Sequence, residues 1–585
     1  MFIVLGPAPD AGPGTWCAVP ADPDAPAGLP QAPAPVTFPR EAAADVVRAL
    51  PERLGVAAGA VRWVLASTAE EYPRWLASGI RVDAVRDLSL GQRILLRAAA
   101  AGAVEYRPAV ELAVHEPDGV APVEAATTPG LEQTAMFELA APAAQAAPDV
   151  RVLAAEFAAQ QRAVAASAHP ARLRLLLAAE SQGALVAAEM HRSGLPWRAD
   201  LHDARLTERL GPRPAEGERP ARLQALAERV AADLDSPGLN PDSQKDLLRA
   251  LQTAGVTVDS TRQHELQAWA ARGGAEAAAR TARIAALLEY KALYRLWTAN
   301  GWHWLDTWVR DGRFHAAYLV GGVVTGRWAA HGGGAMQVPA VVRDAVRADP
   351  GHLLTVADAS QVEPRILAAM AQDAALAAAG STPDLYREVA EQGRSAGTAL
   401  DDRSRAKVAL LGAMYGATTG DSAALLPHLR RLYPAALALL EQAAAAGEAG
   451  RPVATWLGRF SPLPEPRWLE AVADRSTRQA ESRAGTMRRS AGRFTRNFVV
   501  QGTAAEWALC WMGGIRRRLR AAGARTELVF FVHDEVVLHG PAEEAEAVAA
   551  AVREAAAEAG RLLFGDAPVD FPLTVSQTES YADAK

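Results

Sequence analysis

The sequence predicts an α+β protein built from several domains. Its 585 residues are too many for one ordinary hydrophobic core, so two to four domains are expected. Helix-like and strand-like stretches alternate over residues 41–115, which indicates a small α/β domain near the N-terminus. Residues 150–308 carry apolar side chains at three- and four-residue spacings and are predicted to be mainly helical, whereas strands and helices mix from residue 313 onward.

The first domain is expected to end near residue 150. A stretch rich in Pro and Ala, residues 140–149, is typical of a linker. Farther along, Ser-Pro-Gly-Leu-Asn-Pro at residues 236–241 predicts a turn, and Asp242 or Ser243 can cap the helix that follows it.

The composition indicates a globular protein of a reducing compartment. Half of the residues are apolar, and the two cysteines, Cys17 and Cys510, lie far apart in the sequence. Neither a disulfide framework nor a cysteine-based metal site is therefore expected. The N-terminal apolar run is too short for a signal peptide and lacks its basic flank, and no run is long enough to span a bilayer. A cytoplasmic location follows as the expectation.

The charge pattern matters more than the net charge of -6, because nucleic-acid binding depends on local patches. Residues 475–496 contain seven arginines and one acid, and Arg516, Arg517, Arg518 and Arg520 form a second cluster. Each cluster is either a nucleic-acid surface or a solvated helix face, and the sequence leaves both interpretations open. Only four of the 61 basic residues are lysines, so a lysine inside a motif is less generic than an arginine here.

Two carboxylates are predicted at the ends of buried strands. The apolar run at residues 353–357 ends at Asp358, and Asp534 lies at the tip of a predicted tight β-hairpin formed by residues 528–538. Two acids brought together from separate strands repel unless cations bind between them. Two Mg²⁺ ions held in this way can activate an attacking oxygen and stabilise a leaving oxygen in phosphoryl transfer. A solvated turn residue is the alternative for each acid alone, and the flanking apolar runs weigh against it.

One predicted helix carries cations and an aromatic ring on a single face. Arg403, Lys407, Leu411 and Tyr415 recur every four residues, and Gly416 offers a stop. Arginine and lysine suit the phosphate oxygens of a triphosphate, and tyrosine suits stacking near a base. An exposed amphipathic helix is the alternative, and the scarcity of lysine favours a functional role for Lys407.

Two further segments carry polar residues suited to nucleic acid. Arg493, Asn497 and Gln501 repeat the four-residue spacing, either to hydrogen-bond bases and sugars or as ordinary helix polarity. Thr325-Gly326-Arg327 precedes a glycine-rich stretch that leads to Gln337. No Gly-Lys-Ser/Thr sequence follows these glycines, which excludes a P-loop.

Taken in their order along the chain, these segments resemble those of family A DNA polymerases, the bacterial DNA polymerase I type. Each motif alone is moderately specific, whereas five in order at plausible separations are very specific. The likeness extends from about residue 170 to the C-terminus. The motifs are Thr325-Gly326-Arg327; Asp358-Ala359-Ser360-Gln361 with Glu363 and Arg365; Arg403 and Lys407 with Tyr415-Gly416; Arg493, Asn497 and Gln501 with Gly502; and Val532-His533-Asp534-Glu535.

The resemblance implies a right-hand polymerase fold of palm, thumb and fingers, preceded by a small α/β exonuclease-like domain. It places a degenerate 3′–5′ exonuclease-like domain at residues 1–150 and the polymerase domain at 151–585, with the thumb at about 200–310, the palm at about 311–375 and 500–585, and the fingers at about 376–499.

Proofreading activity is not expected from the first domain. Its chemistry needs Asp-x-Glu on an early strand to hold metals. The first predicted strand, residues 2–6, has no such pair, and Asp22 and Asp24 fall in a proline-rich loop. Residues 81–87 resemble the family's second exonuclease region only faintly.

The resemblance implies catalytic roles for Asp358, Asp534 and Lys407. The two aspartates, helped by the main-chain carbonyl of Ala359, would hold two Mg²⁺ ions, with Mn²⁺ as an alternative. Lys407 would lie with Arg403 on the fingers helix that closes on the incoming nucleotide, and it could protonate the pyrophosphate leaving group.

Substrate contacts are implied for residues of all five motifs. Glu363 would act as a steric gate that occupies the space a ribose 2′-hydroxyl needs, which favours deoxynucleotides. Tyr415 would sit by the templating base. The remaining nucleotide contacts are expected from Gln361, Arg403, Leu411 and His533, and primer or template contacts from Arg327, Gln337, Tyr415, Arg493, Asn497 and Gln501.

Three departures from the family pattern bear on nucleotide selection. Ala359 stands where the family usually has Tyr, and Leu411 stands where it has Phe or Tyr. The segment after Arg327 is glycine-rich and lacks the usual Asn. Sugar discrimination, base stacking and primer contacts are therefore expected to differ from the family's.

The expected function is a template-directed DNA polymerase that adds deoxynucleotides to a primer 3′ end by two-metal phosphoryl transfer, in replication or repair. Its expected partners are primer–template DNA and deoxynucleoside triphosphates, and it is expected to act as a monomer without a membrane. A single-subunit RNA polymerase and a non-catalytic nucleic-acid-binding relic are the alternatives. Glu363 argues against the first, and the presence of both Asp358 and Asp534 against the second. The excess of arginine over lysine indicates a GC-rich bacterial genome, with nucleoid association expected, or a phage.

Overall fold

The computed structural model describes residues 1–9, 12, 14–21, 35–113, 148–215, 217–274, 276–331, 338–417 and 420–584. These residues form two compact units. The first comprises Met1–Gly194, Ala316–His331 and Gly351–Gln577, and the second comprises Leu195–His315, Gly332–Pro350 and Thr578–Lys585.

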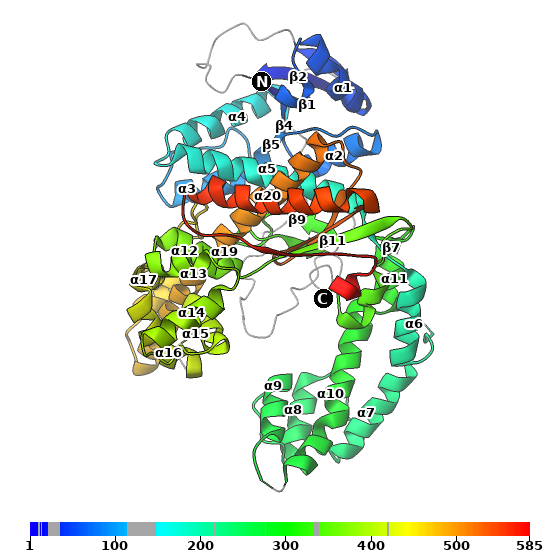
Figure 1. Cartoon of the computed structure of the whole chain (residues 1–585), viewed down its shortest axis with the longest axis vertical. Coiled ribbons are helices and arrows are strands. Elements are labelled where there is room, and N and C mark those ends of the chain that lie inside the picture. Colours follow the sequence, from blue (N-terminus) through cyan, green and yellow to red (C-terminus); the bar gives the residue numbers. More distant parts are fainter. Residues whose placement is uncertain are drawn as a thin grey trace. The chain divides into compact units, whose positions relative to one another are not determined.

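A five-stranded sheet forms the N-terminal part of the first unit. Its strand order is β3-β2-β1-β4-β5, with β1 antiparallel to β2 and parallel to β4. Side chains alternate along β1, so that Ile3 and Leu5 join one core with Trp63, and Val4 joins another with Phe157. Helices cover the sheet, which confirms the predicted α/β architecture of this part (Figure 1). The elements are β1 (Phe2–Pro7), β2 (Thr15–Ala21), β3 (Val36–Pro39), α1 (Ala43–Arg53), β4 (Arg62–Leu65), α2 (Thr68–Ala77), β5 (Val85–Asp87), α3 (Leu88–Ala100), α4 (Val150–Ala165) and α5 (Pro170–Ser193).

A second sheet of four strands lies in the same unit. Its order is β12-β13-β11-β14, and β13 is antiparallel to both β11 and β12. Helices α5, α19 and α20 contact this sheet. Every residue of α19 from Asn497 to Met512 is buried, which marks this half of the helix as part of the core. The elements are β11 (His352–Ala359), α19 (Arg478–Ala521), β12 (Glu527–Val532), β13 (Glu535–Pro541), α20 (Ala545–Phe564) and β14 (Leu573–Thr578).

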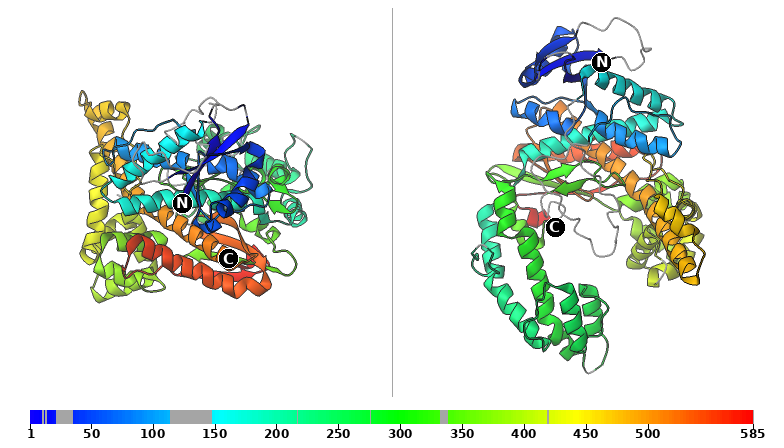
Figure 2. Two further views of the ribbon diagram at one scale, coloured as in Figure 1. Left: turned by 90° about the horizontal axis from the view of Figure 1, so that it is seen from above. Right: turned by 180° about the vertical axis from the view of Figure 1, so that it is seen from behind.

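The remaining helices of the first unit follow β11 in the chain. Among them α17 lies beside α19, as Figures 1 and 2 show, and a Cβ at Gly447 would lie 2.6 Å from the carbonyl oxygen of Ala491 on α19. Helix α15 contacts α14 and α16 and ends at Gly416, whose φ of +72° is the left-handed conformation that glycine favours. These helices are α12 (Val362–Ala371), α13 (Ala374–Gly380), α14 (Leu385–Ser395), α15 (Arg403–Tyr415), α16 (Gly420–Leu432), α17 (Pro434–Glu448) and α18 (Pro466–Ala473).

A two-stranded ribbon, β9 (Ala317–Leu319) and β10 (Ala329–His331), completes the first unit. The loop between its strands contains the Thr325-Gly326-Arg327 segment singled out in the sequence.

The second unit is mainly helical. Its helix α10 contacts α7 and α9, and its sheet has the order β6-β8-β7. The side chain of Ser243 accepts a hydrogen bond from the amide of Asp246, so the predicted cap is confirmed. The elements are β6 (Leu195–Pro196), α6 (Ala199–Leu210), α7 (Ala221–Asp233), α8 (Gln244–Thr253), α9 (Gln263–Ala270), α10 (Ala277–Asn300), α11 (Trp302–Trp308), β7 (Val309–Arg310) and β8 (Arg313–Phe314).

Several smaller expectations have clear outcomes. Cys17 and Cys510 are both buried and carry free thiols. Among the described residues, no helix combines the length and apolarity needed to cross a membrane. Asp22, Asp24 and most of the predicted linker, residues 140–147, lie outside the described residues.

Candidate active site

The two predicted carboxylates meet at one end of the four-stranded sheet. Asp358 is the next-to-last residue of β11, and Asp534 lies in the two-residue turn between β12 and β13. The amide of Ala359 donates a hydrogen bond of 2.9 Å to the main-chain oxygen of Asp534. His533, the other turn residue, has a φ of +54°, which makes the turn tight enough to bring Asp534 beside β11.

Burial dominates the electrostatics of Asp534. Burial raises the pKa of Asp534 to about 6, the positive charge of Arg327 opposes this rise, and the charges of Glu363 and Asp358 add to it. A third acid was not predicted as part of the site. Glu535 is paired with Asp358 in the β13–β11 register and is only 2% exposed. Its position directly after Asp534 in the predicted hairpin is the sequence feature that could have identified it.

The donor set fits a hard divalent cation. No group of three or more His, Cys, Asp or Glu side chains that could enclose a metal occurs in the described part of the chain. The main chain of Asp534 is nevertheless hydrogen-bonded to Ala359, the residue after Asp358, and the charge of Asp358 acts on Asp534. Mg²⁺ is commonly held by one or two carboxylates, with substrate phosphates and waters completing its shell. Two carboxylates that act on one another also gain from a cation.

Glu363 lies beside the carboxylates and is held by two donors. Arg327 Nη2 donates a hydrogen bond of 2.7 Å to its Oε1, and Tyr415 Oη donates one of 2.6 Å to its Oε2. The Glu363 side chain is almost buried, at 8% exposure. Burial and the charge of Glu363 raise the pKa of Tyr415, which keeps its hydroxyl protonated and able to donate. Residues from three separate motifs therefore form one polar cluster.

Helix α15 presents the predicted cationic face. Asp402 caps its first turn, and the exposed side chains of Arg403 and Lys407 follow one turn apart. Arg403 Nε donates a hydrogen bond of 2.7 Å to Asp384, which also accepts one of 2.9 Å from Gln361 Nε2. Asp384 was not predicted. Because it caps α14 and orients both Arg403 and Gln361, only the fold reveals this role.

The comparisons with known proteins decide the family. The family model for DNA polymerase family A matches residues 215–581. The chain belongs to this family.

Curated relatives of this family A chain are bacterial. DNA polymerase I of Chloroflexus aurantiacus is 30% identical over 267 residues, which cover 42% of this chain and 27% of that protein. DNA polymerase I of Pseudomonas aeruginosa is 29% identical over 46% of this chain and 29% of that protein, and the thermostable enzyme of Thermus aquaticus is 28% identical over 46% and 32%. The matched part of the chain thus spans about a third or less of these relatives.

A solved structure shows the family A fold over nearly the whole chain. The polymerase domain of Pol1 from M. smegmatis, solved in complex with a DNA primer-template and dNTP, superposes with a TM-score of 0.65 at 20% identity. The superposition covers 98% of this chain and 93% of that one. It confirms the predicted right-hand polymerase fold.

The other predicted residues of the family A site lie on α19 and near the hairpin. Arg493 is exposed, and its Cγ lies 2.7 Å from where a Cβ at Gly416 would stand, so the end of α15 packs directly on it. Asn497 and Gln501 are nearly buried, at 6% and 8% exposure. Gln337 lies outside the described residues.

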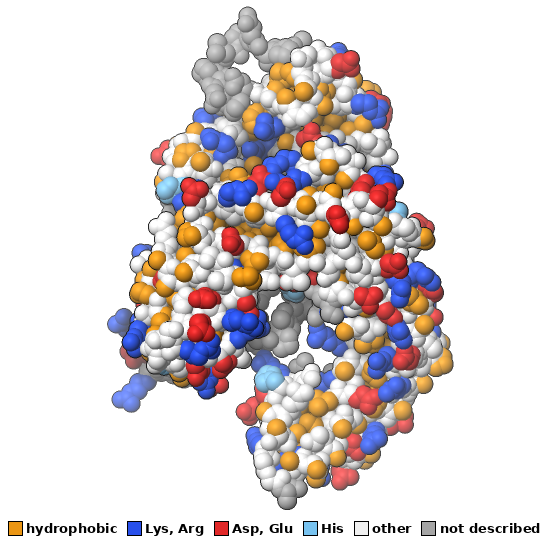
Figure 3. Space-filling view, in the orientation of Figure 1, with side chains coloured by type: hydrophobic (Ala, Val, Ile, Leu, Met, Phe, Trp, Pro, Cys, Tyr) orange, Lys and Arg blue, Asp and Glu red, His pale blue; other side chains and the backbone are white. Residues whose placement is uncertain are grey.

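The second arginine cluster forms ion pairs within the protein. Arg516 pairs with Glu189, Arg520 pairs with Asp83, and both Arg517 and Arg518 pair with Glu558. Arg516 is buried and has a structural role, whereas Arg517 is exposed, so a nucleic-acid surface at this cluster stays a prediction. On the face shown in Figure 3, basic and acidic side chains are interspersed without one continuous basic field.

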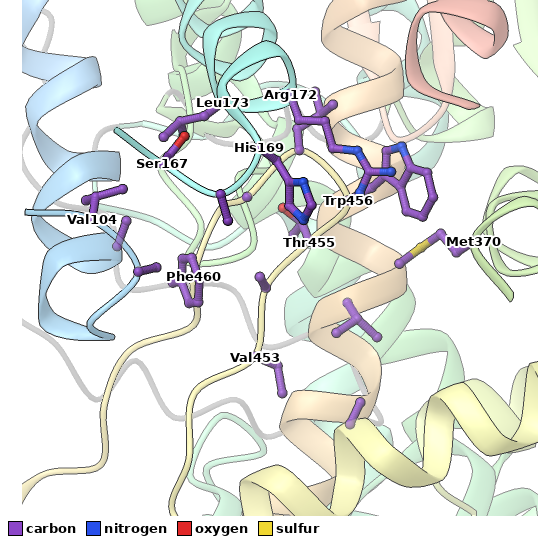
Figure 4. A pocket seen from close by; sticks show the side chains of 18 of the residues that line it. Val104, Ser167, His169, Arg172, Leu173, Met370, Val453, Thr455, Trp456 and Phe460 are labelled. Atoms are coloured by element: carbon purple, nitrogen blue, oxygen red, sulfur yellow. The ribbon is translucent and has the colours of Figure 1, made fainter. Parts of the chain in front are cut away.

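A cavity of about 510 Å³ lies apart from the carboxylates of the family A site. It is bordered by the end of α3, the loop before α5, α17 and residues 453–460. Figure 4 shows Arg172 over the ring of Trp456, with its guanidinium carbon 3.8 Å from the ring centroid. Neither Asp358 nor Asp534 lines it.

Proposed function

We propose that this chain is a template-directed DNA polymerase that extends a primer 3′ end with deoxynucleotides, in replication or repair. The convergence of Asp358 and Asp534 at the β11 end, beside the Glu363 cluster, carries the proposal. Membership of family A supports it, as does the likeness to a polymerase domain solved with primer-template and dNTP. The bacterial relatives support a bacterial enzyme, for which a cytoplasmic, nucleoid-associated location is proposed.

Asp358, Asp534 and the carbonyl of Ala359 are the proposed ligands of two Mg²⁺ ions, for which Mn²⁺ can substitute. When bound, the ions supply charge stabilisation to the attacking and leaving oxygens of phosphoryl transfer. The raised pKa of Asp534 supports this assignment, because a carboxylate that resists ionisation in the apoprotein gains most from a neighbouring cation.

Arg403 and Lys407 are proposed to bind the triphosphate, and Lys407 to donate a proton to the departing pyrophosphate. Their exposure on one face of α15 leaves their charges accessible to a ligand. Gln361 and Asp384 keep Arg403 oriented through the contacts described above. Leu411, on the same face, and His533, at the hairpin tip, complete the proposed nucleotide contacts.

Glu363 is proposed to select deoxynucleotides by filling the space beside the sugar. Two donors, Arg327 and Tyr415, fix both of its oxygens, so the carboxylate cannot rotate away without losing two hydrogen bonds. Primer and template are proposed to contact Arg327, Gln337, Tyr415, Arg493, Asn497 and Gln501.

The predicted domain bounds are kept in this proposal. The thumb is assigned to about residues 200–310, the fingers to about 376–499, and the palm to about 311–375 and 500–585. Residues 1–150 are assigned to an exonuclease-like domain without proofreading activity, since β1 carries no acid that could hold a metal.

Primer extension by wild type and by Asp358→Ala tests the function. We expect the variant to lose about 10³-fold or more in rate, because several kcal/mol of charge stabilisation depend on its carboxylate. Asp566→Asn, which changes an exposed acid after α20, is the matched control and should extend like wild type. Extension by Asp358→Ala at the wild-type rate would contradict the mechanism. Preference for ribonucleotides would indicate the RNA polymerase alternative, and DNA binding without extension by wild type would indicate the relic.

A further inference from the structure

Arg327 is carried by a tight turn. The amide of Gly326 donates to the carbonyl of Val323 at 2.8 Å, and the amide of Val323 donates to the carbonyl of Arg327 at 3.0 Å. Gly326 has a φ of +91°, which side chains disfavour. The position of this turn therefore sets where the Arg327 side chain begins, and with it the ion pair to Glu363.

Two arginines of α3 hold the chain just before and within this turn. Arg93 Nη2 donates a hydrogen bond of 2.9 Å to the carbonyl of Val320, and Arg97 Nη1 donates one of 3.3 Å to the carbonyl of Val324. The arginines lie one helical turn apart, so both reach the same segment. Their partners are more than 220 residues away in the sequence.

The arginine side chains can approach this segment closely because Gly321 and Gly326 have no side chains. A Cβ at Gly321 would lie 2.5 Å from Arg93 Nη2 and 2.9 Å from Glu180 Oε1, and a Cβ at Gly326 would lie 2.5 Å from Arg459 Nε. Arg459 and Glu180 form an ion pair in which both side chains are almost fully buried. Three arginines thus converge on the turn around one carboxylate.

Placing these arginines together is unfavourable, because their positive charges repel one another and burial removes them from water. Burial and the charges of Arg93 and Arg459 lower the pKa of Arg97 to about 10, and burial also lowers that of Arg93. The main-chain carbonyls of Val320 and Val324 accept hydrogen bonds from these charged side chains. Figure 4 shows Val104, which follows α3, and Phe460 at the cavity described above. The hydrogen bonds of Arg93 and Arg97 link α3 directly to the turn.

We propose that Arg93 and Arg97 are positioning residues for nucleotide selection: they fix the Val320–Arg327 segment, which aligns Arg327 on Glu363 and thereby holds the gate. This rests on the proposed function of Glu363. In this proposal, the exonuclease-like domain contributes to polymerisation without binding a metal itself.

The experiment measures the ratio of kcat/KM for a deoxynucleotide to that for the matching ribonucleotide. We expect Arg97→Met to lower this ratio about tenfold, as the loss of one orienting contact predicts, and Arg97→Lys, which keeps a donor, to recover part of it. Arg53→Met, an exposed arginine at the end of α1, is the matched control and should leave the ratio unchanged.

A double-mutant cycle with Arg327→Met tests the route of the effect. If Arg97 acts through Arg327, the double variant should lose no more discrimination than Arg327→Met alone. Full additivity, or an unchanged ratio in Arg97→Met with only a lower Tm, would overturn the proposal.

Amide hydrogen exchange provides a readout that does not depend on polymerisation. Exchange at the amides of Val323 and Gly326 should be faster in Arg97→Met than in wild type and unchanged in Arg53→Met. Unchanged exchange would overturn the anchoring itself. Absence of extension by wild type would instead refute the proposed function, so the two failures are distinguishable.

Discussion

Asp87 and Asp358 both stand where a strand gives way to a helix, and they have different neighbours. Asp87 ends β5 and caps α3. It accepts hydrogen bonds from the amides of Thr68 and Leu90 at 2.7 and 3.0 Å, and from the hydroxyl of Ser89 at 2.8 Å. With 2% exposure it is a buried acid whose charge is met by protein donors. The N-terminal sheet thus uses its strand-end acid for structure.

Asp358 lies in a region that contains several other acids. Asp534 lies in the adjoining turn, Glu535 is its partner in the strand register, and Glu363 follows in α12. Such a group is stabilised by a cation rather than by more amides. Position at a strand end therefore does not by itself identify a catalytic acid. Asp87 is a structural cap, whereas Asp358 lies next to other acids in the strand register and the adjoining turn, which is the basis of its proposed role.

The strongest way to break this comparison is to neutralise one acid in each region. Asp534→Asn should lower the rate of primer extension about 10³-fold or more, and it should leave Tm equal or higher because it relieves like-charge repulsion. Asp87→Asn should leave the extension rate unchanged and lower the stability by about 2 kcal/mol, because an amide nitrogen would face a donor. Extension assays measure the rates, and thermal and urea unfolding of the same preparations measure Tm and the free energy of unfolding.

The Asp534→Asn variant also tests proofreading. Wild type and Asp534→Asn should both leave a mismatched 3′ end intact in the presence of Mg²⁺. Degradation of that end by Asp534→Asn would show a second metal site in the N-terminal region and would remove the contrast between the two acids.

The next largest effect is expected at Glu363, whose role depends on shape as well as charge. Glu363→Ala should raise the use of ribonucleotides relative to deoxynucleotides about 10²-fold, since it opens the space that the side chain fills. Tyr415→Phe removes only one of the two hydrogen bonds to Glu363 and should cost a few-fold in the same ratio. Competitive incorporation of the two nucleotides measures it. An equal effect of the two variants would mean that the hydrogen bond, and not the bulk of Glu363, makes the selection.

Local patterns in the sequence predicted the pieces of the site well. The four-residue period of Arg403, Lys407 and Tyr415 corresponds to α15, and the apolar runs around Asp534 correspond to the β12–β13 hairpin. Both depend on contacts between residues close in sequence. The order of the motifs then identified the family, which the family model confirms.

Pairings between distant residues could not be predicted in this way. The partner of Arg516 is Glu189, 327 positions away, and Arg97 reaches Val324 across 227 positions. No periodicity links such residues, because only the packing of α3, α5 and α19 brings them together. This is why the arginines at 516–520 remained ambiguous as a sequence cluster, and why Asp384 was missed as the residue that orients Arg403.

The smallest expected effect concerns a third kind of acid, one buried within a helix of the core. Glu506 of α19 accepts hydrogen bonds from the hydroxyl of Thr455 and, at 3.0 Å, from the amide of Leu457. Burial still raises its pKa to about 7, above the ordinary value of 4.5. Because the folded protein binds the Glu506 proton more tightly than the unfolded chain does, proton binding stabilises the fold. This stabilisation is full below pH 4.5 and is lost as the pH rises toward 7.

Wild type should therefore lose about 2 to 3 kcal/mol of stability between pH 5 and pH 8 relative to Glu506→Gln. Urea unfolding at the two pH values measures this, with Glu546→Gln, an exposed acid of α20, as the control. If stability changed with pH in the same way in wild type and Glu506→Gln, two hydrogen-bond donors would be enough to keep this buried acid ionised. Glu506 would then resemble Asp87, whose charge is met by protein donors.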